Sequence, residues 1–531
     1  MEAFPSRRSV VMAPNGIVAT SQPLAAQAGL RILLAGGNAM DAAVATAAVL
    51  NVVEPVSTGI GGDAFALIWD GATLHALNAS GRSPAAMSID ALRRAGHEGI
   101  PYFGPWPITV PGAVDGWCAI IERFGRLSMA EALAPAIEYA ERGFPVSPLI
   151  ARGWAANVAR LLEYSGPDGG GYLTDGRAPR AGEVWRQPAL ARALRAIGEG
   201  GRDAFYRGPL AAAIAQTVQN AGGVLTEADL AANAPTWEPP IGVDYRGVRL
   251  YETPPNGQGL AALVALAIAG GWDLAAMGFG SLAATHLLLE AMKVGWADAL
   301  AYVADPSFAP APLNSLLADD YARSRREGIA PDVARAPVAG RFAPRSDTVY
   351  LSVVDADRNA VSFINSNYAG IGSGVVVREW GIALQNRGAL FTTEPGHPNT
   401  LEPLKRPFHT IIPAMAFRHG RPWLSFGVMG GYMQPQGHVQ VLTNLVDFGM
   451  DPQQSLDAPR WQVDPLTGRV LLEPGLGYLA SALDRLGHAI AVTEAEASAQ
   501  FGGGQVILID PETNMLHAGS DPRKDGCAVG Y

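Results

Sequence analysis

Cysteine is scarce in this chain, since Cys118 and Cys527 are the only two among 531 residues. Their separation matches neither a metal-binding motif nor a thiol redox motif. The nine histidines show no ligand spacing, and the glycine clusters at Gly61 and Gly502 lack the Lys-Ser/Thr pair that follows a phosphate-binding loop. We therefore expect neither a metal ion nor any other cofactor.

Basic charge and long apolar runs are also lacking. The formal net charge is −10 and the pI is about 5.4, which argues against nucleic acid as a partner because phosphate binding needs a basic face. No uninterrupted apolar stretch reaches the length of a membrane span. Arg7 and Arg8 are not followed by the apolar region of a signal peptide. The sequence thus predicts no membrane association and a cytoplasmic location.

Hydrophobic residues are plentiful, at 48% of the chain, which allows a sizeable core. Helix and strand patterns alternate along it. The predicted helices include 25–34, 39–51, 128–143 and 282–303, and the predicted strands include 63–69, 73–77, 348–355, 360–364 and 411–417. Residues 330–346, APDVARAPVAGRFAPRS, are rich in Pro, Ala and Arg without periodicity, which predicts a loose, exposed tether.

One threonine stands directly after this tether, at the start of the strand pattern in SDTVYLSVVD. Read as a pattern, Thr348 is a β-branched residue favoured in strands on packing grounds. A second interpretation is chemical. If the bond between Asp347 and Thr348 were cut, one residue would carry both a hydroxyl nucleophile and an amine base, a minimal unit for acyl transfer. The spacing alone leaves both interpretations open.

Longer blocks of sequence favour the chemical interpretation. The stretch DTVYLSVVDADRNAVSFINSNYAGIGSG resembles the start of the small subunit in the gamma-glutamyltransferase family, whose members cleave themselves before a threonine. Further similar blocks follow in family order across nearly the whole chain: 21–71, TVPGAVDGW, DYRGVRLYETPPNGQG, LLLEAMKVGWADALAYVADP, LKRPFHTIIPAMAF, GVMGGYMQPQGHVQVLTNLVDFGM, DAPRW and GSDPRKDGCAVGY. This shared order is more specific than any single motif.

The resemblance implies a fold and a subunit organisation. The fold is expected to be α+β, a four-layer αββα sandwich of the N-terminal nucleophile hydrolase type. Self-cleavage would give a large subunit, 1–347, and a small catalytic subunit, 348–531, which interlock as a heterodimer in one unit. The other partner is a small-molecule amide substrate, and a higher oligomer is possible.

The resemblance also implies catalytic roles for specific residues. Thr348 would attack the Asp347 carbonyl during processing and then serve as the nucleophile, with its freed amine as the base. Gly430 and Gly431 match the glycines of the oxyanion hole, although a dipeptide of this kind also suits a tight turn after a strand. Ser366 stands where relatives carry a threonine that supports the amine of the nucleophile.

The substrate-binding positions depart from those of the family. Its carboxylate-binding arginine aligns with Ser80, its amine-binding asparagine with Tyr368 and its aspartate with Ala389. His409 and Thr410 replace two serines that touch the substrate carboxylate. Loss of the acidic residue removes a charge-assisted bond to an α-ammonium group, so a free glutamyl headgroup should bind less well.

A carboxylate clamp remains available in three side chains, Arg82, Arg387 or His409, and arginine binds carboxylates in a bidentate way. The departures are similar to those of the glutaryl-type cephalosporin acylases and oxamate amidohydrolase in the same family. We expect a self-processing threonine amidohydrolase that favours des-amino acyl groups. The alternatives are a true glutathione hydrolase, an oxamate amidohydrolase and an uncleaved, inactive binding or scaffold protein.

Overall fold

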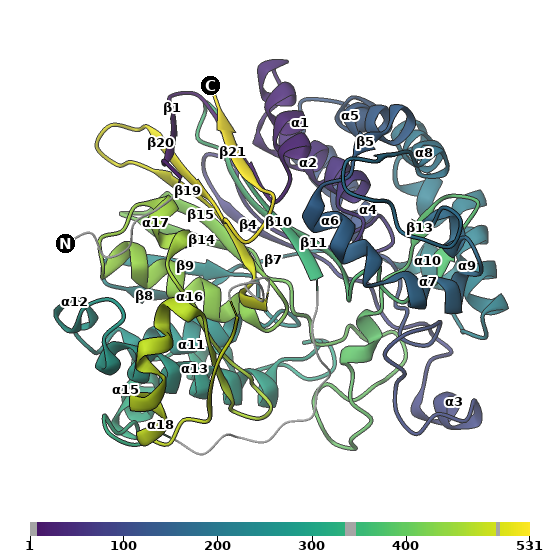
Figure 1. Ribbon diagram of the computed structural model, residues 1–531. Helices are drawn as coiled ribbons and strands as arrows, with labels where there is room; N and C mark the ends of the chain where they lie inside the picture. The colour runs from purple at the N-terminus through teal and green to yellow at the C-terminus, as the bar shows by residue number, and fades with distance from the viewer. Residues whose placement is uncertain (1–7, 335–346, 495–499) are drawn as a thin grey trace.

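Two seven-stranded antiparallel sheets form the centre of the molecule (Figure 1). The computed structural model describes residues 8–334, 347–494 and 500–531. One sheet has the order β1 (Val11–Ala13), β20 (Leu516–Ser520), β19 (Gly503–Ile509), β15 (Arg421–Met429), β14 (Ala414–Arg418), β9 (Val248–Glu252) and β8 (Ile241–Tyr245). The other has the order β21 (Cys527–Gly530), β2 (Ile17–Thr20), β10 (Asp347–Val354), β11 (Ala360–Tyr368), β3 (Asp63–Trp69), β4 (Leu74–Ala79) and β7 (Thr236–Glu238).

The sheets pack face to face, with β10 and β11 against β15 and β2 against β19 and β20. Helices cover both outer faces, as Figure 1 shows. On the β10 side lie α1 (Pro23–Leu34), α2 (Ala39–Val53) and α4 (Ala113–Phe124), with α5 (Met129–Arg142) and α8 (Pro188–Tyr206) outside them. On the β15 side lie α11 (Gly259–Ala269), α16 (Met433–Val446) and α17 (Pro452–Asp457), with α13 (Leu282–Tyr302) outside α11. The predicted four-layer αββα arrangement is confirmed.

The remaining elements are peripheral. The other helices are α3 (Ile89–Arg94), α6 (Pro148–Ala155), α7 (Val158–Ser165), α9 (Pro209–Asn220), α10 (Glu227–Ala232), α12 (Leu274–Met277), α14 (Leu313–Leu316), α15 (Asp319–Glu327) and α18 (Ala480–Arg485). Short strands pair outside the main sheets: β5 (Phe144–Pro145) with β6 (Val184–Trp185), β12 (Val376–Val377) with β13 (Ile382–Ala383), and β16 (Trp461–Val463) with β17 (Val470–Leu472) and β18 (Ile490–Val492). Among the described residues, no helix combines the length and apolarity that a membrane span requires.

Sequence determines where the inner helices begin. Asn38 caps α2 by accepting hydrogen bonds from the backbone of Met40 and Asp41, and the Asp41 side chain accepts one from the Asn38 N–H. Every residue of α2 is buried, which agrees with its run of alanines and valines and with its place between β10, β11 and α5. A helix that is apolar on all sides is expected in such an inner layer.

The prediction for 411–417 was partly wrong, because β14 begins only at Ala414. Pro413 has no N–H to contribute to a strand ladder, and the N–H of Ile412 instead bonds the side chain of Gln434 at 3.0 Å. The tether predicted at 330–346 lies outside the described residues from position 335 onward. Its first part is not loose, since the N–H of Ala334 bonds the carbonyl of Leu486 at 2.7 Å.

Candidate active site

Thr348 is the second residue of β10, between β2 and β11 in the middle of its sheet. The ladder pairs Asp347 with Tyr368 but Val349 with Asn365, so β11 contributes an extra residue opposite Thr348. Bulges of this kind redirect a side chain and occur next to active sites. The threonine is 1% exposed, and its surroundings are therefore set by the fold.

Three donors converge on the hydroxyl oxygen of Ser366. Thr348 donates from Oγ1 at 3.2 Å, Tyr368 from its backbone N–H at 2.9 Å and Arg387 from Nη2 at 3.1 Å. The structure thus brings together four of the residues singled out in the sequence. Ser366 links the candidate nucleophile to a guanidinium group.

Arg387 is a fully buried cation that contacts hydroxyl groups rather than carboxylates. It begins a short 3-10 helix, Arg387–Leu390, and is 0% exposed. Its Nη1 donates to Thr410 Oγ1 at 2.7 Å, while Nε has no partner among the described residues. The guanidinium carbon lies 4.5 Å from the ring centre of Tyr368. Burial lowers the pKa of Arg387 to about 10 and a charge on Asp63 opposes that shift, so the group remains cationic at neutral pH.

The alternative clamp, Arg82, is already engaged. Its Nη1 lies 2.9 Å from Asp305 Oδ2 and donates to the Leu404 carbonyl at 3.1 Å, with the side chain 30% exposed. Ser80, which aligns with the family's arginine, donates its hydroxyl to Asn78 at 2.7 Å. These partners differ from Ser366, which accepts a hydrogen bond from Thr348. A role for either in substrate binding stays a prediction.

Gly430 and Gly431 follow β15 with φ angles of +119° and +60°. Neither backbone N–H donates a hydrogen bond to another described residue, whereas the carbonyl of Gly431 accepts one from Gln258 Nε2 at 2.8 Å. The same Nε2 donates to the Thr410 carbonyl, which joins the glycines to the Arg387 cluster. Helix α16 begins at Met433, and a helix N-terminus favours negative charge. Two free N–H groups at this place suit a developing oxyanion.

His409 forms a buried pair with Asp63, a residue that the sequence analysis did not select. Nε2 of His409 lies 3.1 Å from Asp63 Oδ2, and both side chains are 0% exposed. Burial holds the pKa of His409 well below its ordinary value, with help from Arg387 and Arg406. Burial also raises the pKa of Asp63 to about 6, and Arg387 gives the largest opposing effect. His409 is thus a neutral donor rather than a carboxylate clamp.

Aromatic side chains surround the guanidinium of Arg387. Tyr368 has a positive φ of +76°, and its ring centre lies 5.8 Å from that of Tyr102. Tyr432 directly follows the glycine pair and is partly buried, and its buried hydroxyl has no partner among the described residues. Burial raises the pKa of Tyr368 and of Tyr432 above the ordinary range, so both stay neutral donors. Ala389, at the aligned acidic position, is a partly buried apolar residue.

One cluster of possible metal ligands was missed, because His286 and Glu290 on α13 meet His488, which is distant in sequence. The two imidazoles approach to 2.8 Å through His286 Nδ1 and His488 Nε2. Lys293 Nζ lies 2.7 Å from Glu290 Oε1 and 3.1 Å from His488 Nδ1. An ammonium group therefore already supplies the positive charge that a metal ion would bring.

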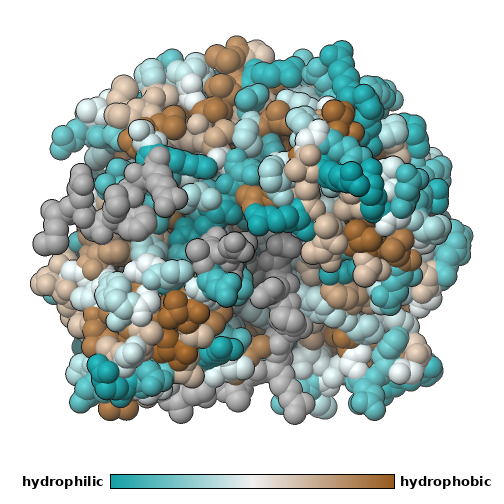
Figure 2. Space-filling view, viewed as in Figure 1, coloured by the Kyte–Doolittle hydropathy of each residue, from teal (hydrophilic) through white to brown (hydrophobic). Residues whose placement is uncertain are grey.

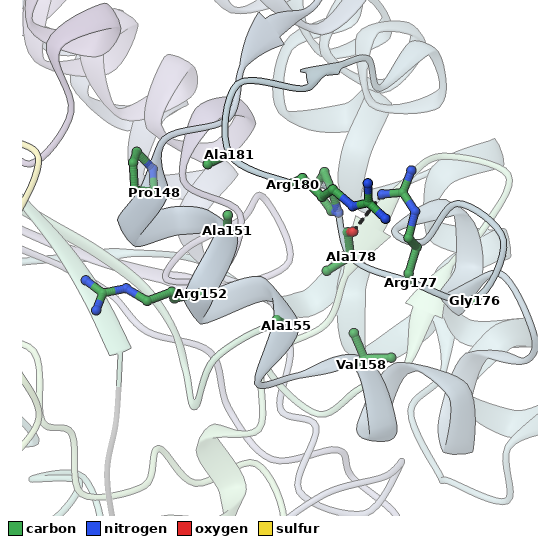
Figure 3. Close-up of a pocket in the computed structure, with 11 residues that line it drawn as sticks. Pro148, Ala151, Arg152, Ala155, Val158, Gly176, Arg177, Ala178, Arg180 and Ala181 are labelled. Carbon is green, nitrogen blue, oxygen red and sulfur yellow. Dashed lines mark hydrogen bonds between the residues drawn. The ribbon is translucent and has the colours of Figure 1, made fainter.

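A cavity of about 600 Å³ lies elsewhere, between α6 and the loop at 176–181. Its floor includes Ala151 and Ala155 on α6, while Arg152 extends to one side and Arg177 and Arg180 lie on the other (Figure 3). None of the residues around Thr348 lines it. On the face in Figure 2, exposed hydrophobic residues are interspersed with hydrophilic ones.

Comparisons with known proteins agree with the fold. The sequence model of the family described as Gamma-glutamyltranspeptidase matches residues 25–531. The chain is 40% identical to a "Glutathione hydrolase-like YwrD proenzyme" of Bacillus subtilis (strain 168), covering 98% of this chain and 99% of the relative. It is 37% identical to an "Oxamate amidohydrolase proenzyme" of Klebsiella pneumoniae, covering 97% and 98%. A cephalosporin acylase structure from Bacillus halodurans superposes with a TM-score of 0.94 at 48% identity, covering 99% and 98%.

Proposed function

The chain belongs to the gamma-glutamyltranspeptidase family and is an N-terminal nucleophile enzyme that acts on amide bonds; from this premise we propose that it is a self-processing threonine amidohydrolase. Its substrate is the amide of a carboxylate-bearing acyl group that lacks an α-amine. The observation that carries the substrate assignment is the buried guanidinium of Arg387, which donates to hydroxyl groups and is joined to Thr348 through Ser366.

Processing comes first in this proposal. The Thr348 hydroxyl attacks the Asp347 carbonyl, the acyl group moves from nitrogen to oxygen, and water hydrolyses the ester to leave 1–347 and 348–531. Each sheet contains strands from both fragments, since β10 lies beside β2 in one sheet and β14 lies beside β9 in the other. The cleaved chains would therefore remain an interlocked heterodimer.

Substrate hydrolysis then uses the new N-terminus of Thr348. An α-amine has a pKa of about 7.7 to 8.0, so a useful fraction is neutral at pH 7 and accepts the hydroxyl proton. Oγ1 attacks the substrate carbonyl, and the N–H groups of Gly430 and Gly431 stabilise the oxyanion. The protonated amine gives its proton to the leaving nitrogen. Water then attacks the acyl-enzyme, the same amine accepts its proton, and the acid is released.

Charge explains the preference for a des-amino acyl group. A substrate carboxylate placed at Arg387 satisfies a cation that has no carboxylate partner among the described residues, and arginine forms strong, charge-assisted bonds with such a group. An α-ammonium group at the same place is repelled by Arg387 and finds Ala389 where relatives carry an acid. A buried like-charge contact of this kind is costly.

Cleavage can be tested directly. Purified protein should give two bands on a denaturing gel, and N-terminal sequencing of the smaller chain should begin at Thr348. The variant Thr348→Ala should give one band near 55.5 kDa, the mass of the full chain. An active enzyme made of one uncut chain contradicts the mechanism and leaves a different nucleophile to be found. An inactive, uncut protein supports the scaffold alternative.

The acyl group can be tested with chromogenic amides. Glutaryl-p-nitroanilide should be hydrolysed with a higher kcat/KM than γ-glutamyl-p-nitroanilide, and equal or better turnover of the glutamyl compound supports the true glutathione hydrolase. Oxamate is the second candidate substrate, because only Ser366 separates Arg387 from Thr348 and a short acyl chain fits that spacing. Ammonia release from oxamate measures this activity.

A further inference from the structure

Asp63 lies beside the proposed substrate-binding cation and is held by three donors. Oδ1 accepts from the backbone N–H of Gly81 at 3.0 Å and of Gly112 at 3.1 Å. Oδ2 faces Nε2 of His409 at 3.1 Å. The ladder between β3 and β11 places Asp63 directly opposite Ser366. The carboxylate therefore stands next to the group that joins Thr348 to Arg387.

The tautomer of His409 follows from its contacts. Nδ1 accepts from the backbone N–H of Ile411 at 3.4 Å, which leaves the proton on Nε2, facing Asp63. The imidazole is neutral because burial and the positive charges of Arg387 and Arg406 oppose its protonation and lower its pKa. His409 thus orients Asp63 without neutralising it.

Two positive charges face Asp63. Arg387 is the stronger influence on its pKa, and Arg406 is weaker. The Arg406 guanidinium already donates to the carbonyls of Ser80 and Ala234. Among the described residues, the carboxylate bonds the two glycine amides and His409, and Ser366 lies opposite it on β11. In the empty site, Asp63 and Arg387 are consequently a buried anion and cation that balance each other.

We propose that Asp63 is the counter-charge of Arg387 in the empty site and takes up one proton from solvent when a carboxylate binds Arg387. The inference rests on the proposed function, because it assumes that Arg387 receives the substrate carboxylate. The bound anion pairs with the guanidinium and adds a second negative charge. The single positive charge of Arg387 then no longer balances the negative charge of ionised Asp63. Protonation restores neutrality, and His409 acts as a positioning residue.

This linkage has a defined pH dependence. The pKa of Asp63 is about 6 in the empty site, and bound carboxylate raises it further. Affinity for the anion is therefore constant below about pH 6. Above that value it falls by up to about tenfold per pH unit, because the anion must then bring a proton with it. The neutral fraction of the Thr348 amine affects kcat separately.

Butyrate is a suitable probe, since it carries one carboxylate and no amide to be hydrolysed. Isothermal titration of the processed enzyme at pH 7.0, in two buffers of different ionisation enthalpy, counts the protons exchanged. We expect an uptake of roughly half a proton or more per butyrate bound. Any proton uptake by the Thr348 amine should persist in Asp63→Asn, whereas the uptake by Asp63 should be lost in that variant. Binding without proton uptake overturns the proposal and does not depend on any variant folding.

Variants separate Asp63 from other groups. In Asp63→Asn, the inhibition constant of butyrate should be nearly flat between pH 6 and 7.5, whereas wild type should weaken about tenfold. Glu54→Gln is the matched control, because Glu54 is another buried carboxyl, with a pKa raised to about 7 by burial, but bonds Ser21 and Ser57 instead. It should retain the wild-type profile.

The outcome is distinguishable from failure of the proposed function. If Asp63→Asn keeps the wild-type profile while glutaryl-p-nitroanilide is still preferred, the proton-uptake proposal is wrong and the substrate proposal stands. If butyrate does not compete with substrate at all, Arg387 is not the carboxylate site and both proposals fall.

Discussion

Arg387 donates a hydrogen bond of 3.1 Å to the hydroxyl oxygen of Ser366, the same oxygen that accepts a bond from Thr348. A single hydroxyl group, that of Ser366, thereby bridges a buried guanidinium and the candidate nucleophile. Positive charge so close to the reacting group favours a neutral over a protonated amine at Thr348 and attracts an anionic substrate. Under the proposed function, this one side chain would influence both catalysis and specificity, which makes it the first target for mutation.

Arg387→Gln should lower kcat/KM for glutaryl-p-nitroanilide by about 10- to 100-fold, since hydrogen bonds to charged groups contribute about 1.5–3 kcal/mol. Most of the effect should appear in KM. The same change should narrow the gap between glutaryl and γ-glutamyl substrates, because it removes repulsion of the α-ammonium group. Steady-state kinetics with both p-nitroanilides measures this.

The matched control for that experiment is Arg82→Gln. Arg82 pairs with Asp305 and remains 30% exposed, so its loss should affect stability more than acyl selectivity. If Arg82→Gln changes the selectivity and Arg387→Gln does not, the carboxylate site lies at Arg82.

Ser366→Ala should slow both processing and turnover. The change removes the hydroxyl that accepts from Thr348, Arg387 and the Tyr368 N–H, leaving three buried donors without this partner, at about 1–3 kcal/mol for such a loss. A time course on a denaturing gel follows the processing. Ser366→Thr keeps the hydroxyl and should restore both rates. Full activity of Ser366→Ala with normal maturation argues against any role in supporting the nucleophile.

The sequence predicted the layered fold and the position of Thr348 because both depend on local patterns and on family order. The helix at 39–51 and the strand at 63–69 needed only apolar runs and flanking turns. The pairing of Asp63 with His409 could not be predicted in the same way. Those residues are far apart in sequence. They meet because the start of β3, which pairs with β11, lies against the loop before β14.

The three candidate clamps show a similar limit. Sequence alone left Arg82, Arg387 and His409 open as alternatives. The partners distinguish the two arginines. Arg82 pairs with Asp305, whereas the contacts of Arg387 among the described residues are with hydroxyl groups and an aromatic ring. The position of Tyr432 directly after Gly431 was a sequence signal that it lies near the site. The burial of its hydroxyl, in contrast, could not be read from any sequence pattern.

Gly430→Ala should reduce kcat by about 100-fold or more, the range for loss of an oxyanion donor. A Cβ at this position would lie 3.0 Å from the Cα of Gly502, and φ is +119°, so the peptide must move. Gly449→Ala is the control, because φ there is +64° with open space around it. It should cost about 1 kcal/mol of stability with kcat unchanged. Equal kcat values in the two variants would exclude Gly430 from the oxyanion hole.

His488 should make the folded protein less stable in weak acid. Burial lowers its pKa from 6.5 to about 3, with further contributions from Lys293 and His286. In the unfolded chain the imidazole binds a proton below about pH 6.5, whereas the folded protein does not until about pH 3. Stabilisation by the neutral imidazole is therefore complete above pH 6.5 and is lost progressively as the pH falls toward 3.

His488→Gln should flatten this part of the stability profile, because glutamine can still donate to His286 Nδ1 but does not titrate. Urea midpoints at fixed protein concentration, from pH 4 to pH 7.5, measure the slope. His419→Gln, on the exposed turn after β14, should keep the wild-type slope. A wild-type slope in His488→Gln would mean that the cluster accepts a proton in the folded state. Lys293 would then have to move from its position 3.1 Å from His488 Nδ1, because two cationic groups cannot share that buried contact.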